Sequence, residues 1–175
     1  DVARLITQGG KRDGANIAIL SVDHPDIREF IHCKDGTENL EPDDPRSMAN
    51  FNISVGITDA FMNEVVTGSG SSYDLMMEIA MSAWRSGDPG MFFLDTVNKH
   101  HYAPHLGPIE ACNPCGEVPQ LDNEACTLGS INLGHFVAHH GIQWERLEVV
   151  TALATRYLDE VLDHDQYPDP AITEA

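Results

Sequence analysis

Residues 16–22 read NIAILSV, and residues 51–57 read FNISVGI. The first is a short apolar run that favours a mostly buried strand, and the second alternates and then becomes apolar, which also favours a strand. A third short run, MFFL, follows at residues 91–94. Helical patterns separate the three runs, and this alternation is typical of parallel βα units. We therefore predict an α/β fold built on a parallel sheet.

Two helices are expected directly after the first two strands. Asp23 suits the cap of a helix over 25–33, which would have a proline near its first position. Thr58 suits the cap of a second helix, over 59–66. Each helix would connect one strand to the next parallel one.

Two longer helices are expected further along the chain. Residues 73–86 are strongly helical and are followed by Gly87, a residue typical of helix ends. Residues 144–163 have an amphipathic pattern, and we expect its apolar stripe to lie in the core. The stripe consists of Leu147, Val150, Ala154, Tyr157, Leu158 and Val161.

The charge balance excludes several kinds of partner. The chain of 175 residues has 28 acidic and 10 basic residues, a formal net charge of −18. Binding to nucleic acid or to an anionic membrane needs clustered basic residues, which the sequence lacks. No apolar run approaches the ~20 residues that cross a bilayer, and the first residues lack the layout of a signal peptide. We expect a soluble, cytoplasmic protein.

The four cysteines are Cys33, Cys112, Cys115 and Cys126, and three of them lie within fifteen residues. In a cytoplasmic chain such a cluster more often indicates metal or redox chemistry than structural disulfides. The cluster is therefore the first indication of function.

Residues 110–119, EACNPCGEVP, contain the most unusual pattern. In an extended backbone, Asn113, Cys115 and Glu117 would point to one face. Pro114 favours an extended residue before it, and Gly116 lets a ligand approach the backbone closely. An amide, a thiol and a carboxylate would then act on one substrate as donor, sulfur centre and general base.

Two simpler interpretations of Cys112 and Cys115 remain open on spacing alone. The pair could be half of a zinc site, although no second pair of ligands with suitable spacing follows. It could also be a thioredoxin-like dithiol, although that motif normally opens a helix directly after a strand. The spacing therefore also allows a small zinc or dithiol module.

Residues 113–117, NPCGE, match the finger-loop motif of ribonucleotide reductases in its adenosylcobalamin-dependent (class II) form. Further matching segments occur in the family's order across the chain: ANIAILSVDHPDIREFI at 15–31, NFNISVGITDAFM at 50–62, GDPGMFFLD at 87–95, PHLG at 104–107 and CTLGSINL at 126–133. The chain resembles the large, catalytic subunit of this family. The resemblance implies that residues 1–175 are an incomplete segment of a ten-stranded α/β barrel.

The resemblance also implies catalytic roles. Cys115 would carry a transient thiyl radical that removes the hydrogen from C3′ of the substrate ribose. Glu117 would take the 3′-hydroxyl proton, and Asn113 would hold the ribose hydroxyls. Cys126 would be one member of the thiol pair whose oxidation supplies the electrons. Cys33 and Cys112 are expected to be bystanders.

A glycine-rich segment near the start matches the family's specificity loop, over residues 7–14. Without the resemblance it would be an ordinary turn. The resemblance implies that it senses an effector nucleotide and selects the substrate base. The residues concerned are Gln8, Gly9, Gly10, Lys11 and Arg12.

Cofactor and partners follow from the same resemblance. We expect adenosylcobalamin as cofactor, a ribonucleoside di- or triphosphate as substrate, and a deoxynucleotide or ATP as effector. A thioredoxin-like dithiol would be the reductant, and the full enzyme would be a homodimer. We expect no metal site. We also expect no activity from these residues alone, because they cannot close a ten-stranded barrel and the partner of Cys126 would lie on an upstream strand. The chain could instead belong to a class I large subunit, or it could be a non-catalytic remnant.

Overall fold

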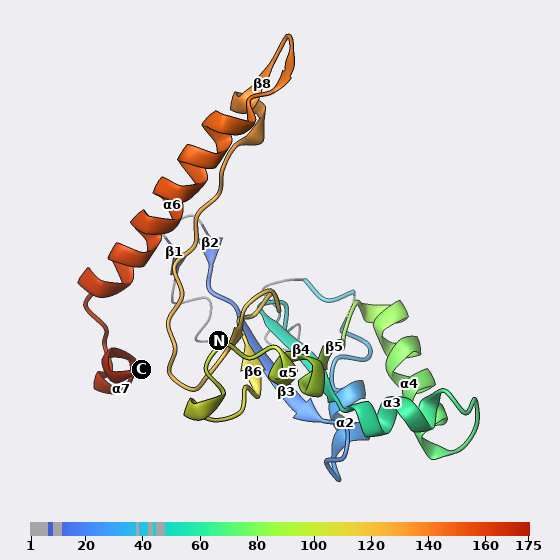
Figure 1. Ribbon diagram of the computed structural model, residues 1–175. Helices are drawn as coiled ribbons and strands as arrows, with labels where there is room; N and C mark the ends of the chain where they lie inside the picture. The colour runs from blue at the N-terminus through green and yellow to red at the C-terminus, as the bar shows by residue number, and fades with distance from the viewer. Residues whose placement is uncertain (1–6, 9–11, 38, 42–43, 45–47) are drawn as a thin grey trace. The chain divides into compact units, whose positions relative to one another are not determined.

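A computed structural model of the protein describes residues 7–8, 12–37, 39–41, 44 and 48–175. The chain divides into two compact units, Asp1–Asp122 and Asn123–Ala175. The first contains the main sheet, and the second contains a long helix (Figure 1).

The centre of the first unit is a three-stranded parallel sheet (Figure 1). Its strands are β3 (Asn16–Ser21), β4 (Phe51–Ile57) and β5 (Gly90–Phe93), in the order β3-β4-β5. Both pairs are parallel. The predicted α/β class and parallel sheet are confirmed, and the sheet is not closed into a barrel within the described residues.

Helices cover one face of this sheet. They are α2 (Ile27–His32), α3 (Asp59–Val65) and α4 (Ser71–Ser86), and a further short helix, α5 (Leu94–Lys99), follows β5. Val55 and Ile57 of β4 are buried against Ile31, Phe61 and Ile79, which come one each from α2, α3 and α4. Removing these apolar side chains from water is the main stabilising contribution on this face.

Two of the predicted helix boundaries rest on local contacts that the structure contains. The hydroxyl of Thr58 accepts a hydrogen bond from the amide of Phe61 at 3.2 Å, so this cap is confirmed. Gly87 ends α4 in the left-handed region, with φ of +84°. Its amide donates to the carbonyl of Ala83 at 2.9 Å.

The predicted start of the first helix is wrong. Asp23 is not its cap, because α2 begins only at Ile27. The amide of Ile27 donates to the carbonyl of His24, and the amide of Asp26 donates to Nδ1 of the same histidine. His24 thus satisfies amides that Asp23 was expected to serve, and an extra turn precedes the helix.

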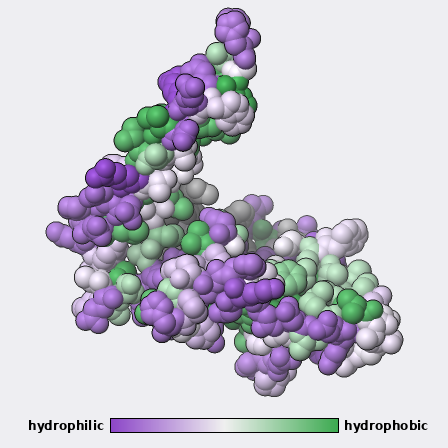
Figure 2. Space-filling view, viewed as in Figure 1, coloured by the Kyte–Doolittle hydropathy of each residue, from purple (hydrophilic) through white to green (hydrophobic). Residues whose placement is uncertain are grey.

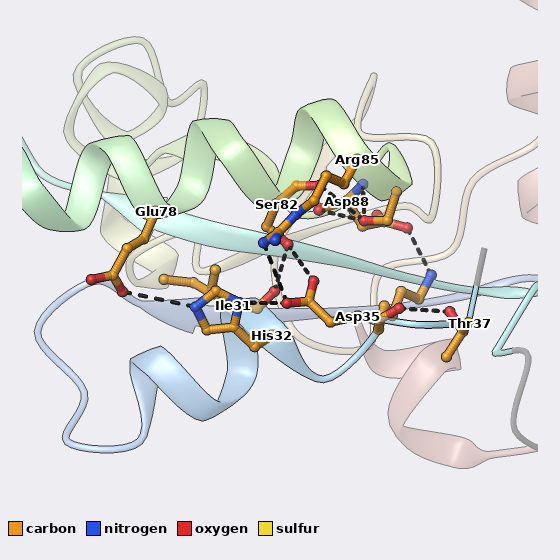
Figure 3. Close-up of polar contacts among 10 residues, drawn as sticks. Ile31, His32, Asp35, Thr37, Glu78, Ser82, Arg85 and Asp88 are labelled. Atoms are coloured by element: carbon orange, nitrogen blue, oxygen red, sulfur yellow. Dashed lines mark hydrogen bonds and ion pairs between the residues drawn. The ribbon is translucent and has the colours of Figure 1, made fainter.

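A polar cluster joins the end of α2 to α4 (Figure 3). Ser82 is only 1% exposed, and its hydroxyl donates to the carbonyl of Ile31 and to the carboxylate of Asp35. Asp35 also contacts His32 at 2.8 Å and Arg85 at 3.4 Å. Desolvation alone would raise the pKa of Asp35, but the hydrogen bonds from His32 and Ser82 and the charge of Arg85 outweigh it and lower the pKa.

The opposite face of the sheet carries a β-hairpin, β6 (Ala111–Cys112) and β7 (Pro119–Gln120). A second apolar cluster lies here, with Phe92, Ile109 and Cys112 buried and Ile17 and Ile19 packed against them. Side chains alternate between the faces of a strand. The residues of β4 between Ile53, Val55 and Ile57 therefore belong to this second face.

The second unit consists of short elements and one long helix. They are η2 (Leu133–Phe136), β8 (Val137–Ala138), β9 (Gly141–Ile142), α6 (Trp144–His164) and α7 (Pro170–Glu174). The predicted helix over 144–163 is confirmed almost to the residue. The first unit also contains η1 (Pro104–Leu106) and a two-stranded sheet of β1 (Thr7–Gln8) and β2 (Arg12–Asp13).

The expectation that the apolar stripe of α6 lies in the core is wrong for this chain. No residue of α6 is buried, and Tyr157 is 69% exposed. Hydrophobic side chains are visible along α6 in Figure 2. Contacts within the unit cover only part of the stripe, such as the segment at Thr127, whose hydroxyl donates to the carbonyl of Leu158. The described part of the chain contains no helix that could span a bilayer.

Candidate active site

The segment with the unusual pattern is the loop of the β6–β7 hairpin. The amide of Asn113 donates to the carbonyl of Val118 at 3.1 Å, and the amide of Val118 donates to Oδ1 of Asn113 at 3.0 Å. The amide of Gly116 donates to the carbonyl of Asn113 at 2.9 Å. Asn113 therefore closes the loop with both its backbone and its side chain.

The expected extended backbone at residues 113–117 is wrong. The chain turns here, and Gly116 has φ of +86°, a conformation that glycine adopts without strain. Period-two alternation applies only to a strand, so Asn113, Cys115 and Glu117 do not share a face in the expected way. All three residues nevertheless lie in the loop at one end of the hairpin.

Cys112 and Cys115 have opposite surroundings. Cys112 is 7% exposed and packs with Phe92 and Ile109, whereas Cys115 is exposed. Burial, and after it the charge of Glu117, raises the pKa of the Cys112 thiol, so this thiol stays protonated at neutral pH. The structure agrees with a bystander role for Cys112.

This difference also bears on the two simpler interpretations. A zinc site would need both sulfurs as thiolates directed at one ion, and Cys112 lies in an apolar cluster. A thioredoxin-like dithiol would stand at a helix start, whereas this motif lies in a β-hairpin. In the described ranges, no group of three or more His, Cys, Asp or Glu side chains could hold a metal ion.

Cys115 lines a hollow of about 320 Å³ between the hairpin loop and the sheet. The sheet contributes the first residues of its strands, and the turn before β5 contributes another wall. Polar and small residues predominate in this lining: Asn52, Ser54, Ser86, Asp88, Gly90 and Gly116. The hollow therefore offers hydrogen-bonding groups beside an exposed thiol.

A side chain of β4 forms a hydrogen bond to the main chain of the loop. Nδ2 of Asn52 donates to the carbonyl of Pro114 at 2.6 Å. Ser54, two residues further along the same face, lies opposite Gly90 of β5. A Cβ at Gly90 would lie 2.7 Å from Oγ of Ser54, so glycine is what leaves room for this hydroxyl.

Asp88, the acidic residue that lines the hollow, forms an ion pair with Lys34. Nζ of Lys34 lies 2.8 Å from the carboxylate of Asp88, and the Lys34 side chain is 8% exposed. Ser86 adds a hydrogen bond from its hydroxyl to the carbonyl of Asp88. The partly buried ion pair and the hydrogen bond to the Asp88 main chain together fix the position of Asp88.

Asn52, Ser54 and Asp88 were not among the predicted site residues. The sequence does contain a signal for the first two, because FNISVGI places a polar or small residue at every second position of a strand. The sequence prediction recognised the alternation at the start of this run but used it only to predict a strand, and assigned no role to Asn52 or Ser54. Asp88 carries no comparable signal, since its position depends on a partner 54 residues away.

The remaining predicted site residues lie elsewhere. Cys126 is exposed and belongs to the second unit, so its relation to Cys115 stays a prediction. Gln8 and Arg12 are register partners in the backbone of the antiparallel pair β1–β2. Gly9, Gly10 and Lys11 lie outside the described residues, and the specificity loop therefore stays a prediction too.

Comparison with protein families decides what the chain is. The family described as "Ribonucleotide reductase, barrel domain" matches residues 1–72 and 68–175. This chain belongs to that family. The two matches overlap at residues 68–72, which are the end of the connector between α3 and α4 and the first two residues of α4.

Curated relatives give the same picture of this reductase segment. It is 40% identical to a vitamin B12-dependent ribonucleoside-diphosphate reductase of Mycobacterium tuberculosis, over 99% of this chain and 26% of that protein. It is also 40% identical to a protein of the same name from Thermoplasma acidophilum, over 94% of this chain and 22% of that protein. The chain thus spans about a quarter of the length of these relatives.

More distant similarity extends to further reductases. The alpha subunit of a ribonucleoside-diphosphate reductase from Chlamydia trachomatis is 26% identical over the whole chain and 21% of that protein. Among solved structures, the alpha subunit of the class Id ribonucleotide reductase of Actinobacillus ureae gives a TM-score of 0.49 at 18% identity. This structural match covers 62% of this chain and 20% of the Actinobacillus ureae chain.

Proposed function

We propose that the complete protein reduces ribonucleotides to 2′-deoxyribonucleotides with adenosylcobalamin as cofactor, by a thiyl-radical mechanism at Cys115. Residues 1–175 would be a segment of its barrel domain, with the specificity loop at 7–14 and the finger loop at 110–119. The observation that carries the proposal is the exposed Cys115 thiol at the hollow between the finger loop and the sheet. The names of the relatives that are 40% identical support the choice of cofactor.

The finger loop would supply the groups that act on the ribose. Cys115, as a thiyl radical, would take the hydrogen atom from C3′. Glu117, which is exposed beside it, would accept the proton of the 3′-hydroxyl. Oδ1 of Asn113 accepts a bond within the loop, so we assign its contact with the ribose hydroxyls to its amino group.

The electrons would come from a pair of thiols. Cys126 and a second cysteine, on a strand upstream of this chain, would be oxidised together to a disulfide. The pair releases two electrons and two protons, and the 2′-hydroxyl leaves as water, which balances the reduction at C2′. An external dithiol of the thioredoxin type would then reduce the disulfide again.

One feature of the described residues agrees with such a cofactor, namely the accessibility of the Cys115 thiol. The Cys115 sulfur is exposed and lines the hollow, so it is accessible to a group bound beside it. When bound, adenosylcobalamin supplies the one-electron oxidant that a thiol needs to become a thiyl radical. The part of this chain is to hold the thiol and to limit access of water around the substrate.

Substrate and partners are further parts of the proposal. The names of the relatives favour a ribonucleoside diphosphate over a triphosphate. The loop containing Gln8, Gly9, Gly10, Lys11 and Arg12 would select the base in response to a bound deoxynucleotide or ATP. We propose that the enzyme is cytoplasmic, because the reducing thiols need a compartment that keeps them reduced. The family resemblance suggests a homodimer.

The test uses the complete parent protein. Deoxycytidine nucleotide formation is measured without oxygen, with a dithiol, and with or without adenosylcobalamin. We expect turnover that requires the cofactor and disappears in Cys115→Ser, whereas Cys33→Ser, at another exposed cysteine, keeps it. Turnover without the cofactor but with a metal-bearing second subunit would move the protein to class I. No turnover in either case would favour a non-catalytic remnant.

A further inference from the structure

We propose that Asn52 is a positioning residue that sets the place of the Cys115 sulfur, by tying the finger loop to the central strand of the sheet. This inference rests on the proposed function for its catalytic consequence. Its structural part stands on the contact between Asn52 and Pro114.

The contact joins the loop to a firmly held strand. Asn52 is the second residue of β4, which pairs with a parallel strand on each side. Its neighbour Ile53 is 2% exposed and Val55 is fully buried. A side chain that begins on such a strand has a fixed origin, so it can hold a loop at a defined distance.

The acceptor lies directly beside the reacting group. Nδ2 of Asn52 donates to the carbonyl of Pro114, the residue before Cys115, at 2.6 Å. The two residues are 62 positions apart, so the bond is a long-range tie and not part of the hairpin. Any shift of this carbonyl would move the Cα of Cys115, which follows after one planar peptide unit.

The hydrogen bonds within residues 113–118 of the described chain have a different character. They join Asn113 to Gly116 and to Val118, inside the loop. Below the loop, Cys112 anchors the hairpin in an apolar cluster, which is not directional. The loop is thus well shaped by its own bonds, and the bond from Asn52 orients it relative to the sheet.

The contact with the Pro114 carbonyl needs a hydrogen-bond donor on the side chain at position 52. An Asp of the same shape would present a carboxylate to the Pro114 carbonyl, two acceptors facing each other. An Ala would leave the carbonyl without this donor. Asn is also a poor residue for the interior of a strand, so its presence here calls for a contact that offsets that preference.

Displacement of Cys115 would act on the chemical step. A reacting group held about 1 Å from its place can lose ~100-fold in rate. A residue that bound the substrate equally in ground and transition state would instead change KM. The inference therefore predicts a lower kcat with little change in KM.

The experiment compares Asn52→Asp and Asn52→Ala with Asn63→Asp, which makes the same chemical change at an exposed site on α3. Hydrogen exchange of the peptide covering residues 111–120 is measured on the complete protein, without cofactor or substrate. We expect exchange about fivefold faster in both Asn52 variants, the scale of one lost neutral hydrogen bond, and no change in Asn63→Asp. In the turnover assay, kcat should fall about 10- to 100-fold at constant KM.

Unchanged exchange in both Asn52 variants would overturn the inference, as would a higher KM at constant kcat. Far-ultraviolet circular dichroism checks that each variant folds, and the two different substitutions at position 52 guard against a defect peculiar to one of them. If the unaltered protein makes no deoxynucleotide, the proposed function fails, while the exchange measurement still tests the tie between Asn52 and the loop.

Discussion

The two faces of the three-stranded sheet differ sharply although they share the same strands. On the helix-covered face, Val55 and Ile57 are almost completely buried among side chains of α2, α3 and α4. On the opposite face, Asn52 and Ser54 line the hollow beside Cys115. One strand, β4, therefore serves packing with one set of alternate residues and the candidate site with the next.

The difference shows how stability and chemistry are separated in this segment. The helix-covered face provides a close-packed support in which small changes of volume are costly. The hollow requires polar groups and open space, which contribute little to stability. Loss of a buried side chain on the first face should mainly lower stability, and loss of a polar side chain at the hollow should mainly alter the site.

The largest expected effect is on the helix-covered face. Ile31 is fully buried, and Ile31→Ala should destabilise the protein by about 2–5 kcal/mol, from lost transfer free energy and from the cavity left behind. Ile19→Ala, at a half-buried residue of the second apolar cluster, is the matched change. Urea titration measures the loss of stability in both variants, and hydrogen exchange of the β4 peptides is measured as a second readout. An equal loss in the two variants would remove the distinction between the faces.

An intermediate effect is expected where β4 meets β5 at the hollow. Gly90→Ala places a Cβ 2.7 Å from Oγ of Ser54, so the hydroxyl or the strand must shift, at about 1–3 kcal/mol. The double variant Ser54→Ala/Gly90→Ala removes the clashing oxygen and should recover most of the loss. Thermal unfolding midpoints give the comparison. A double variant no better than Gly90→Ala would mean that another contact requires the glycine.

The smallest effect concerns the polar cluster between α2 and α4, and it depends on pH. Because the folded-state pKa of Asp35 is lowered, its ionised form stabilises the fold. This contribution is complete above the ordinary pKa, about 4, and is lost as the pH falls through the lowered value. Asp35→Asn should cost roughly 0.2–1 kcal/mol at neutral pH, since the side chain is 34% exposed, and progressively less in acid.

The control for this pH dependence is Asp23→Asn, which removes the same charge at an exposed position. Unfolding midpoints of the two variants are compared between about pH 7 and pH 3. The prediction fails if the Asp35→Asn deficit persists unchanged at the acidic end, because the deficit would then not come from the ionised carboxylate.

Local signals in the sequence predicted much of the fold. The bounds of β4, the Thr58 cap and the Gly87 end of α4 each depend on residues within a few positions of one another. The start of α2 was wrong because His24, not Asp23, satisfies the first amides. That competition between neighbouring acceptors is not visible in residue preferences alone.

The candidate site was predicted less completely. The motif identified Cys115, Asn113 and Glu117 as candidate site residues, but the turn at Gly116 replaces the extended backbone that was expected. Asn52 and Asp88 were missed because each acts through a residue more than 50 positions away. Their roles depend on how the chain folds back on itself, which no local pattern reports.

The bond from Asn52 ends on a main-chain carbonyl, and this has a consequence for how the two positions can vary. Every amino acid offers the same carbonyl, so a replacement of Pro114 can keep the acceptor as long as the loop keeps its path. The donor is a side chain, and most replacements of Asn52 remove it. The hydrogen bond therefore restricts the side-chain chemistry at position 52, but at position 114 it restricts only the path of the backbone. Position 114 should accept more kinds of substitution than position 52.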